Sequence, residues 1–210
     1  MAEFLNKIIP NVMARTDIFW ESFRDTFIMV GWAGGISFLI GIILGITLIV
    51  TRPSGIVPNQ LIYQVIDKIV NFFRSIPFII LLVGLVPLSR AIMGTGIGVK
   101  GAIVPLIFGC APFFTRQMET AMSDVNLGLI EAAQSMGLSN LEIIWSVYLK
   151  ESIAGIARGT TITIISLIGL TAMAGAVGAG GLGNFAIMYG HDRNMPDVTY
   201  TTCLLYTSPS

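Results

Sequence analysis

The feature that most constrains this chain is an uninterrupted apolar run from Phe27 to Val50. The run has 24 residues and no charged side chain. A helix of that length, rising about 1.5 Å per residue, crosses a hydrocarbon core of roughly 30 Å. Of the 210 residues, 54% are hydrophobic and only 11% are charged, whereas soluble domains carry about 25% charged residues. The sequence therefore predicts an all-α membrane protein.

Further apolar segments follow this run. The second builds from Leu61 and is uncharged from Ser75 to Ser89, the third covers residues 101–115, and the fourth covers residues 159–176. The chain becomes polar after Gly190. We therefore expect about four transmembrane helices and a fifth that is truncated. The basic residues divide evenly between the two sides, so the positive-inside rule does not set the orientation.

Proline and glycine are frequent inside these segments. Four prolines are expected to kink or interrupt helices, which a membrane bundle tolerates where neighbours satisfy the freed carbonyls: Pro77, Pro87, Pro105 and Pro112. The pairs Gly31–Gly35 and Gly41–Gly45 have the small-xxx-small spacing that lets helix backbones approach closely. Ordinary helix packing and contact with a second copy of the chain both fit this spacing.

Composition divides the chain into three regions. Residues 1–26 mix charged and apolar positions and lack the pattern of a cleavable signal peptide, so we expect a retained N-terminal amphipathic segment. Residues 27–202 form the expected transmembrane domain, with a polar loop at about 123–150. Residues 203–210 resemble the translation of a sequencing-library transposase adaptor, which predicts a non-native tail.

Several functional classes are disfavoured by what the sequence contains. With 12 basic and 12 acidic residues, the net charge is zero, and no basic field would hold nucleic acid. Cys110 and Cys203 form neither a disulfide framework nor a metal-ligand spacing. The glycines of residues 178–183 match a dinucleotide fingerprint but follow an apolar span instead of a soluble strand. With no catalytic constellation and a lone loop histidine, His191, we expect no catalytic, cofactor or metal site.

The polar loop has the start and stop residues typical of two short helices joined at a sharp corner. Asp124 is placed to cap the first helix, and Gly137 is placed to end it in the left-handed conformation. Ser139 and Glu142 then fit a capping box, so a second helix begins at once. The first helix has an apolar face at spacings of three and four, formed by Val125, Leu129, Ala132, Ala133 and Met136.

The second helix of the loop is amphipathic, with an apolar side formed by Ile143, Ile144, Val147 and Tyr148. Such a corner is expected to lie along the membrane surface. The alanines leave the first helix with a flat face that a partner can approach closely. A connector that packs only on its own bundle fits the spacing equally well.

The loop resembles the coupling loop of ABC importer permeases. That pattern reads Glu-Ala-Ala, three residues, Gly, nine residues, then Ile-x-Leu-Pro; this chain has Glu131, Ala132, Ala133 and Gly137 in register. Val147 and Leu149 follow, with Lys150 where proline is usual. The segments "RSIPFIILL" from residue 74 and "TAMAGAVGAGGLG" from residue 171 resemble the methionine-uptake members of the family.

The resemblance implies a five-helix importer permease core, working as a homodimer in the bacterial cytoplasmic (inner) membrane. It implies import of D- or L-methionine, delivered by an extracytoplasmic substrate-binding (lipo)protein. ATP hydrolysis would reside in a cytoplasmic ABC ATPase dimer, because the chain has no phosphate-binding lysine loop. The implied ATPase-coupling residues are Glu131, Ala132, Ala133, Gly137, Ser139 and Glu142.

The expected translocation pathway lies beside the densest run of small residues, at Thr171, Met173, Ala174 and Val177. A pathway without charges suits a weakly held zwitterion, and Met is a polarizable filler suited to a gate. Met173 could equally pack between helices. A permease for another amino acid or small solute is the main alternative. A channel or ion-coupled transporter usually needs ionisable residues within its spans, and the expected spans have almost none. An intramembrane enzyme needs catalytic groups, which the sequence lacks, so both classes are disfavoured.

Overall fold

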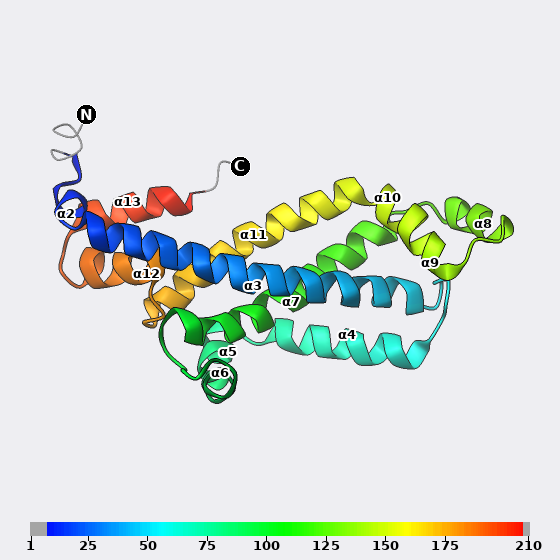
Figure 1. The fold of residues 1–210 in the computed structure, drawn as a ribbon, viewed down its shortest axis with the longest axis horizontal. Coiled ribbons are helices and arrows are strands. Elements are labelled where there is room, and N and C mark those ends of the chain that lie inside the picture. Colours follow the sequence, from blue (N-terminus) through cyan, green and yellow to red (C-terminus); the bar gives the residue numbers. More distant parts are fainter. Residues whose placement is uncertain (1–7, 208–210) are drawn as a thin grey trace. The chain divides into compact units, whose positions relative to one another are not determined.

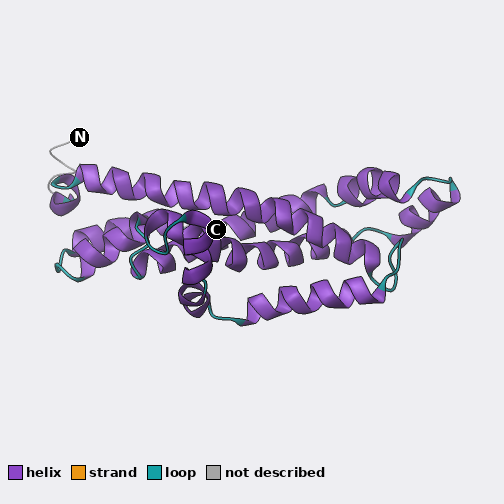
Figure 2. Ribbon diagram, turned by 60° about the horizontal axis from the view of Figure 1, so that its bottom comes forward, coloured by secondary structure: helices purple, strands orange, loops and turns teal. Residues whose placement is uncertain are grey.

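A computed structural model describes residues 8–207, which form helices and connecting loops without a β-strand (Figures 1 and 2). The elements in chain order are α2 (Pro10–Met13), α3 (Thr16–Thr51), α4 (Gln60–Ser75), α5 (Phe78–Gly84), α6 (Val86–Met93), α7 (Gly98–Ser123), α8 (Leu127–Ser135), α9 (Asn140–Ile143), the π-helix η1 (Ile144–Tyr148), α10 (Leu149–Glu151), α11 (Ile153–Ala176), α12 (Gly181–Phe185), the π-helix η2 (Ala186–His191) and α13 (Pro196–Tyr206).

Helices α3, α7 and α11 are long and apolar enough to cross a membrane. The prediction of an all-α membrane protein is therefore confirmed. The first, third and fourth apolar segments correspond to these helices, and α7 extends beyond residues 101–115 at both ends. Pro105 and Pro112 lie inside α7 without ending it.

The second apolar segment is divided among α4, α5 and α6 instead of forming one span. Ile76 adopts an extended conformation, with φ −84° and ψ 125°, and ends α4. Its position before Pro77 explains this, because the proline ring disfavours the helical conformation of the preceding residue. Pro87 lies in the first turn of α6, where a missing amide proton costs nothing.

The chain divides into two compact units, and each of the three long helices contributes residues to both. Unit 1 comprises the described residues within Met1–Gly35, Pro77–Ile107 and Ile165–Ser210, and unit 2 comprises Ile36–Ile76 and Phe108–Ile164. The boundary expected at residue 26 lies inside α3. Of the expected tail, residues 203–206 continue α13, and residues 208–210 lie outside the described part.

Unit 1 is held together near the N-terminal end of α3 by hydrogen bonds and a small apolar cluster. The backbone amide and side-chain amide of Asn11 each donate to a carboxylate oxygen of Asp197, both at 2.9 Å. Val12, Phe185 and Val198 pack together behind this contact. These interactions join α2 to α12 and α13.

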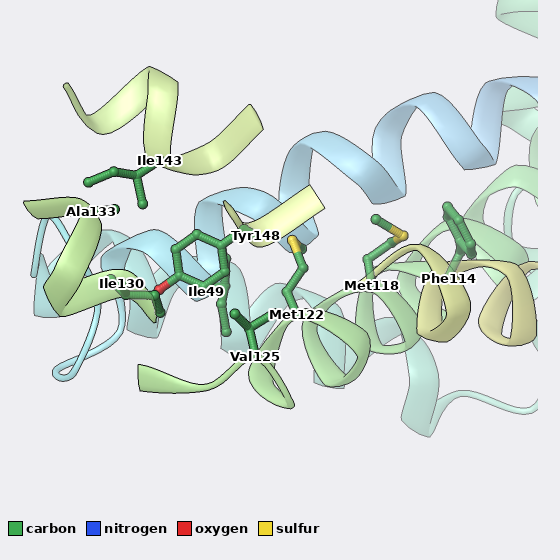
Figure 3. Close-up of a cluster of buried hydrophobic side chains, with 9 residues drawn as sticks. All are labelled: Ile49, Phe114, Met118, Met122, Val125, Ile130, Ala133, Ile143 and Tyr148. Carbon is green, nitrogen blue, oxygen red and sulfur yellow. The ribbon is translucent and has the colours of Figure 1, made fainter. Parts of the chain in front are cut away.

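Unit 2 is organised around one hydrophobic cluster (Figure 3), whose buried members are Ile49, Phe114, Met118, Met122, Val125, Ile130, Ala133, Ile143 and Tyr148. These side chains come from α3, α7 and the loop that follows α7. The polar loop of the sequence is thus anchored in the core of this unit.

Of the two small-xxx-small pairs, Gly41–Gly45 packs within unit 2. A Cβ atom at Gly41 would lie 2.5 Å from the Phe114 ring, and one at Gly45 would lie 2.5 Å from the Met118 Cβ. Glycine at both positions therefore allows α3 and α7 to approach closely. A Cβ at Gly31 or Gly35 would meet no atom of the described chain within 4 Å.

Candidate functional site

The candidate site is the loop between α7 and α11, which we call the coupling segment (residues 123–150) and which lies wholly in unit 2. Its first helix, α8, is capped by Asn126, whose side-chain oxygen accepts a hydrogen bond from the Gly128 amide at 2.8 Å. The prediction that Asp124 caps this helix is wrong. Asp124 lies two residues too early, because α8 begins at Leu127.

The inward face of α8 differs from the predicted one. Ile130 and Ala133 are buried in the core cluster, whereas Leu129, Ala132 and Met136 are exposed. The buried and exposed residues form neighbouring stripes of the helix, since each stripe repeats at a spacing of three or four residues. The predicted face therefore spanned the boundary between the buried stripe and the exposed one. Ala133, at 2% exposure, is a core residue and not part of an outward flat surface.

Gly137 forms the corner as predicted. Its φ of +77° lies in the left-handed region, which glycine adopts without a Cβ penalty. The Gly137 amide donates to the Gln134 carbonyl at 3.0 Å, and the Leu138 amide donates to the Ala133 carbonyl at 3.2 Å. This pair of bonds is a Schellman motif, which satisfies carbonyls at the end of α8.

The predicted capping box at the start of α9 is confirmed. The Ser139 amide donates to the Glu142 carboxylate at 2.7 Å, and the Glu142 amide donates to the Ser139 hydroxyl oxygen at 3.4 Å. Hydrogen bonds from the Ser139 hydroxyl and amide lower the pKa of Glu142. A lowered folded-state pKa means that this stabilisation is present above the ordinary Glu pKa and is lost as the pH falls through the lowered value.

After α9 the segment continues through η1, which anchors it in the core. Ile143 and Tyr148 are fully buried, and Ile144 and Val147 are half-buried, so the predicted apolar side is confirmed. Figure 3 shows the Tyr148 ring among Ile49, Ile130 and Met122. The inward side thus fixes the second helix to the same cluster as α8.

The outward side carries three exposed apolar side chains, of which Leu141 and Trp145 were not predicted as site residues. Leu141 and Trp145 are each 69% exposed, and Met136 is 72% exposed. Leu141 and Trp145 are four residues apart, hence on one face, and a tryptophan within a polar stretch was an available signal. Glu131, Ala132, Gly137, Ser139 and Glu142 are also exposed. The exposed side of the coupling segment therefore carries four large apolar side chains, Leu129, Met136, Leu141 and Trp145, together with the carboxylates of Glu131 and Glu142.

The four residues expected to line the pathway separate into two sets at the C-terminal end of α11, where Val177 lies in the turn just after the helix, within unit 1. Thr171 and Ala174 are buried, and the Thr171 hydroxyl donates to the Ile168 carbonyl at 2.7 Å. Met173 and Val177 are exposed, at 42% and 47%. Because residues four apart share a helix face, Met173 and Val177 lie on one open side and the other two pack inward.

The glycine-rich stretch after α11 forms a bend, as expected. Gly178, Gly180 and Gly181 all have positive φ angles. The Leu182 amide at the start of α12 donates to the Thr26 hydroxyl oxygen at 2.9 Å. The stretch therefore follows a membrane-spanning helix and is tied to α3, a context different from that of a dinucleotide-binding loop.

The capping box leads to a prediction about local order. Replacing Ser139 with Ala removes the acceptor for the Glu142 amide and is expected to cost about 1 kcal/mol, so amides of α9 should exchange with solvent several-fold faster. Ser135→Ala is the matched control, because its exposed hydroxyl only donates back to the Glu131 carbonyl. Hydrogen exchange by mass spectrometry is the measurement. Equal exchange of α9 in the two variants would contradict a structural role for the box.

Comparisons with known proteins bear on this arrangement. The family described as "Binding-protein-dependent transport system inner membrane component" matches residues 37–208. The D-methionine transport system permease protein MetI of Escherichia coli (strain K12) is 47% identical over 146 residues, which are 70% of this chain. The alignment spans 65% of that relative's length. The probable D-methionine transport system permease protein MetI of Vibrio cholerae is 43% identical over 188 residues, covering 90% of this chain and 84% of the relative.

Solved structures resemble the fold over most of the chain. An inward facing conformation of the MetNI methionine ABC transporter matches with a TM-score of 0.85 and 42% identity, covering 90% of this chain and 89% of that chain. An amino acid ABC transporter with histidines matches with a TM-score of 0.75 at 17% identity, covering 94% of this chain and 90% of that chain, which shows the shared fold alone. The chain belongs to the family of binding-protein-dependent transport system inner membrane components.

Proposed function

We propose that this chain is the permease subunit of an ATP-driven ABC importer for methionine. The observation that carries the proposal is the coupling segment, a rigid helix–corner–helix with an apolar outward face. The similarity to D-methionine permeases at 43–47% identity supports the choice of methionine. The sequence has no phosphate-binding lysine loop of the kind that P-loop ATPases use. In this proposal ATP is therefore hydrolysed by a separate subunit, and this chain is a transporter subunit and not an enzyme.

The coupling segment is suited to receive force from a cytoplasmic ATPase dimer. The capping box and the Schellman motif satisfy its backbone, while Ile130, Ala133 and Ile143 fix it to the core of unit 2. A segment fixed in this way moves as a body instead of deforming locally. Large apolar side chains gathered on an exposed surface mark an interaction site, and Leu141 and Trp145 are the anchors we assign.

The proposed assembly has further partners. A second copy of the chain completes the pathway, because a two-fold ATPase dimer matches a two-fold permease dimer. An extracytoplasmic binding protein supplies methionine. Glu131, Ala132, Gly137, Ser139 and Glu142 belong to the ATPase-docking surface, and Ala133 supports that surface from within the core.

The proposed pathway follows the open side of α11. Met173 and Val177 present flexible and apolar side chains there, which suits passage of a thioether without tight binding. Thr171 and Ala174 shape the helix packing behind this side.

A pair of substitutions at Met173 tests this placement. Met173→Ala is expected to raise basal ATP hydrolysis or leak about two- to fivefold, because it opens the gate, and Met173→Trp is expected to block uptake. Uptake of labelled methionine and basal hydrolysis are measured in proteoliposomes. Ala174→Trp is the contrasting variant, since its buried site should lower folded protein instead. Normal behaviour of both Met173 variants at parental expression would remove Met173 from the pathway.

The proposed function is tested by co-purification with an ABC ATPase subunit from the same organism. We expect a stable complex whose ATP hydrolysis in liposomes is stimulated by methionine together with the binding protein. Histidine and a small non-amino-acid solute serve as comparison substrates for the alternative permease functions. Stimulation by one of these, and not by methionine, would contradict the substrate; absence of any complex would contradict the importer assignment.

A further inference from the structure

Helices α4 and α7 are joined within unit 2 by a network of charged and polar side chains. Arg116 on α7 forms ion pairs with Asp67 on α4 and with Glu119, three residues further along α7. The guanidinium also donates to the Asn71 side-chain oxygen at 3.0 Å and to the Asp67 backbone carbonyl at 3.4 Å. The Asn71 amide in turn donates to the Asp67 carboxylate at 3.1 Å. One arginine fork thus holds three acceptor side chains from two helices.

On α7, the members of the network lie within the helix and not at its end. Arg116 is seven residues before the end of α7 at Ser123, about two helical turns. Arg116 and Glu119 each expose 17% of the side chain, and Asp67 exposes 30%, so water only partly screens these charges.

Apolar contacts also hold α4 within unit 2. Val70 is the one buried residue of α4, and the Phe73 ring packs against Phe108 with centroids 5.0 Å apart. The apolar side chains of Leu61, Val65, Ile69 and Phe72 are exposed. The polar network therefore adds directional, charged contacts between α4 and α7 to this apolar packing.

The same stretch of α7 is packed together with the coupling segment. Met118 and Met122, on the turns that follow Arg116, belong to the cluster that contains Ile130, Ala133 and Ile143. Only residues 124–126 separate α7 from α8. The coupling segment is therefore packed against the turns of α7 that directly follow Arg116.

We propose that Arg116, Asp67, Asn71 and Glu119 form an interhelical clamp that makes α4 move with α7 when the coupling segment is displaced. The proposal rests on the proposed function, in which an ATPase displaces the coupling segment. Arg116 and Asp67 are then positioning residues: they touch no substrate, but they transmit movement to the helix that leads through Ile76 and Pro77 into α5.

A charge exchange tests the clamp in the complete complex. Asp67→Arg places two arginines together, and Arg116→Asp places three carboxylates together, so each should lower methionine uptake per ATP hydrolysed by about tenfold. The double exchange again sets one arginine between two carboxylates and is expected to restore at least about half of the parental ratio. Arg116→Lys should be intermediate, because an ammonium cannot reproduce the planar fork. Lys68→Gln is the control, an exposed charge on the same helix without an ion pair in the described structure.

A second measurement needs no partner. The apparent melting temperature of the detergent-purified chain should fall in each single variant and recover in the double exchange. Failure of recovery would overturn the clamp itself. Recovery combined with parental uptake-to-hydrolysis ratios in the single variants would overturn its role in transmission. If the parental chain instead binds no ATPase, the proposed function fails, while the melting temperatures still decide whether the clamp exists.

Discussion

Replacing Ala132 with tryptophan is expected to reduce ATP-driven methionine uptake by about a hundredfold while the chain remains folded, a loss equivalent to roughly 2.7 kcal/mol of coupling. Ala132 is exposed on the outward side of α8, where a partner is proposed to approach the helix closely. An indole there occupies the space of the docked ATPase but contacts nothing in the core. Uptake in proteoliposomes, with the amount of co-purified ATPase, is the measurement.

The neighbouring alanine supplies the matched contrast. Ala133 is 2% exposed in the same helix, so Ala133→Trp should damage the cluster around Ile130 and Ile143 and lower the yield of folded protein. Ala132→Ser, a small exposed substitution, should transport normally. Parental uptake and parental ATPase binding in Ala132→Trp would show that this face of α8 is not docked.

Replacing Gly137 with valine is expected to lower uptake by about tenfold or more. The position has a φ of +77°, and the left-handed conformation costs an ordinary residue roughly 1–2 kcal/mol and a β-branched residue more. A Cβ here would meet no atom of the described chain within 4 Å, so the effect is conformational and not steric. The corner should open, and the outward faces of α8 and α9 should lose their fixed relation.

Asparagine separates this cause from others. Asparagine, like valine, adds a side chain at residue 137, but it tolerates the left-handed conformation. Gly137→Asn should therefore retain most of the uptake. Hydrogen exchange of the Leu138 amide, which bonds to the Ala133 carbonyl, reports the corner directly. If valine and asparagine behave alike, the left-handed corner is not what transport requires.

The local features of the coupling segment could be predicted from sequence because their signals are local. Gly137 lies just beyond a short helix, and Ser139 and Glu142 have the spacing of a capping box, so neighbouring residues determine both structures. The first residue of α8 was harder to predict from the sequence. Asp124 and Asn126 are both good caps, and the packing of Val125 and Ile130 in the core decides between them.

Features that depend on distant residues could not be read in this way. Arg116 and Asp67 are 49 positions apart, and no periodicity connects them. The division of α11 into a buried side with Thr171 and an open side with Met173 could have been predicted, because helical spacing alone places these two residues on different sides. The interruption at Ile76 was likewise signalled by Pro77, which was expected to kink or interrupt a helix.

The most direct test of the account is the accumulation of labelled methionine in liposomes that contain this chain, an ABC ATPase subunit from the same organism and the binding protein. We predict that methionine is taken up against its gradient and that this uptake requires ATP. Ala132→Trp should abolish the uptake, and Ala132→Ser should preserve it. Methionine uptake that proceeds equally without ATP, or that is unchanged by Ala132→Trp at parental protein levels, would contradict coupling through residues 123–150.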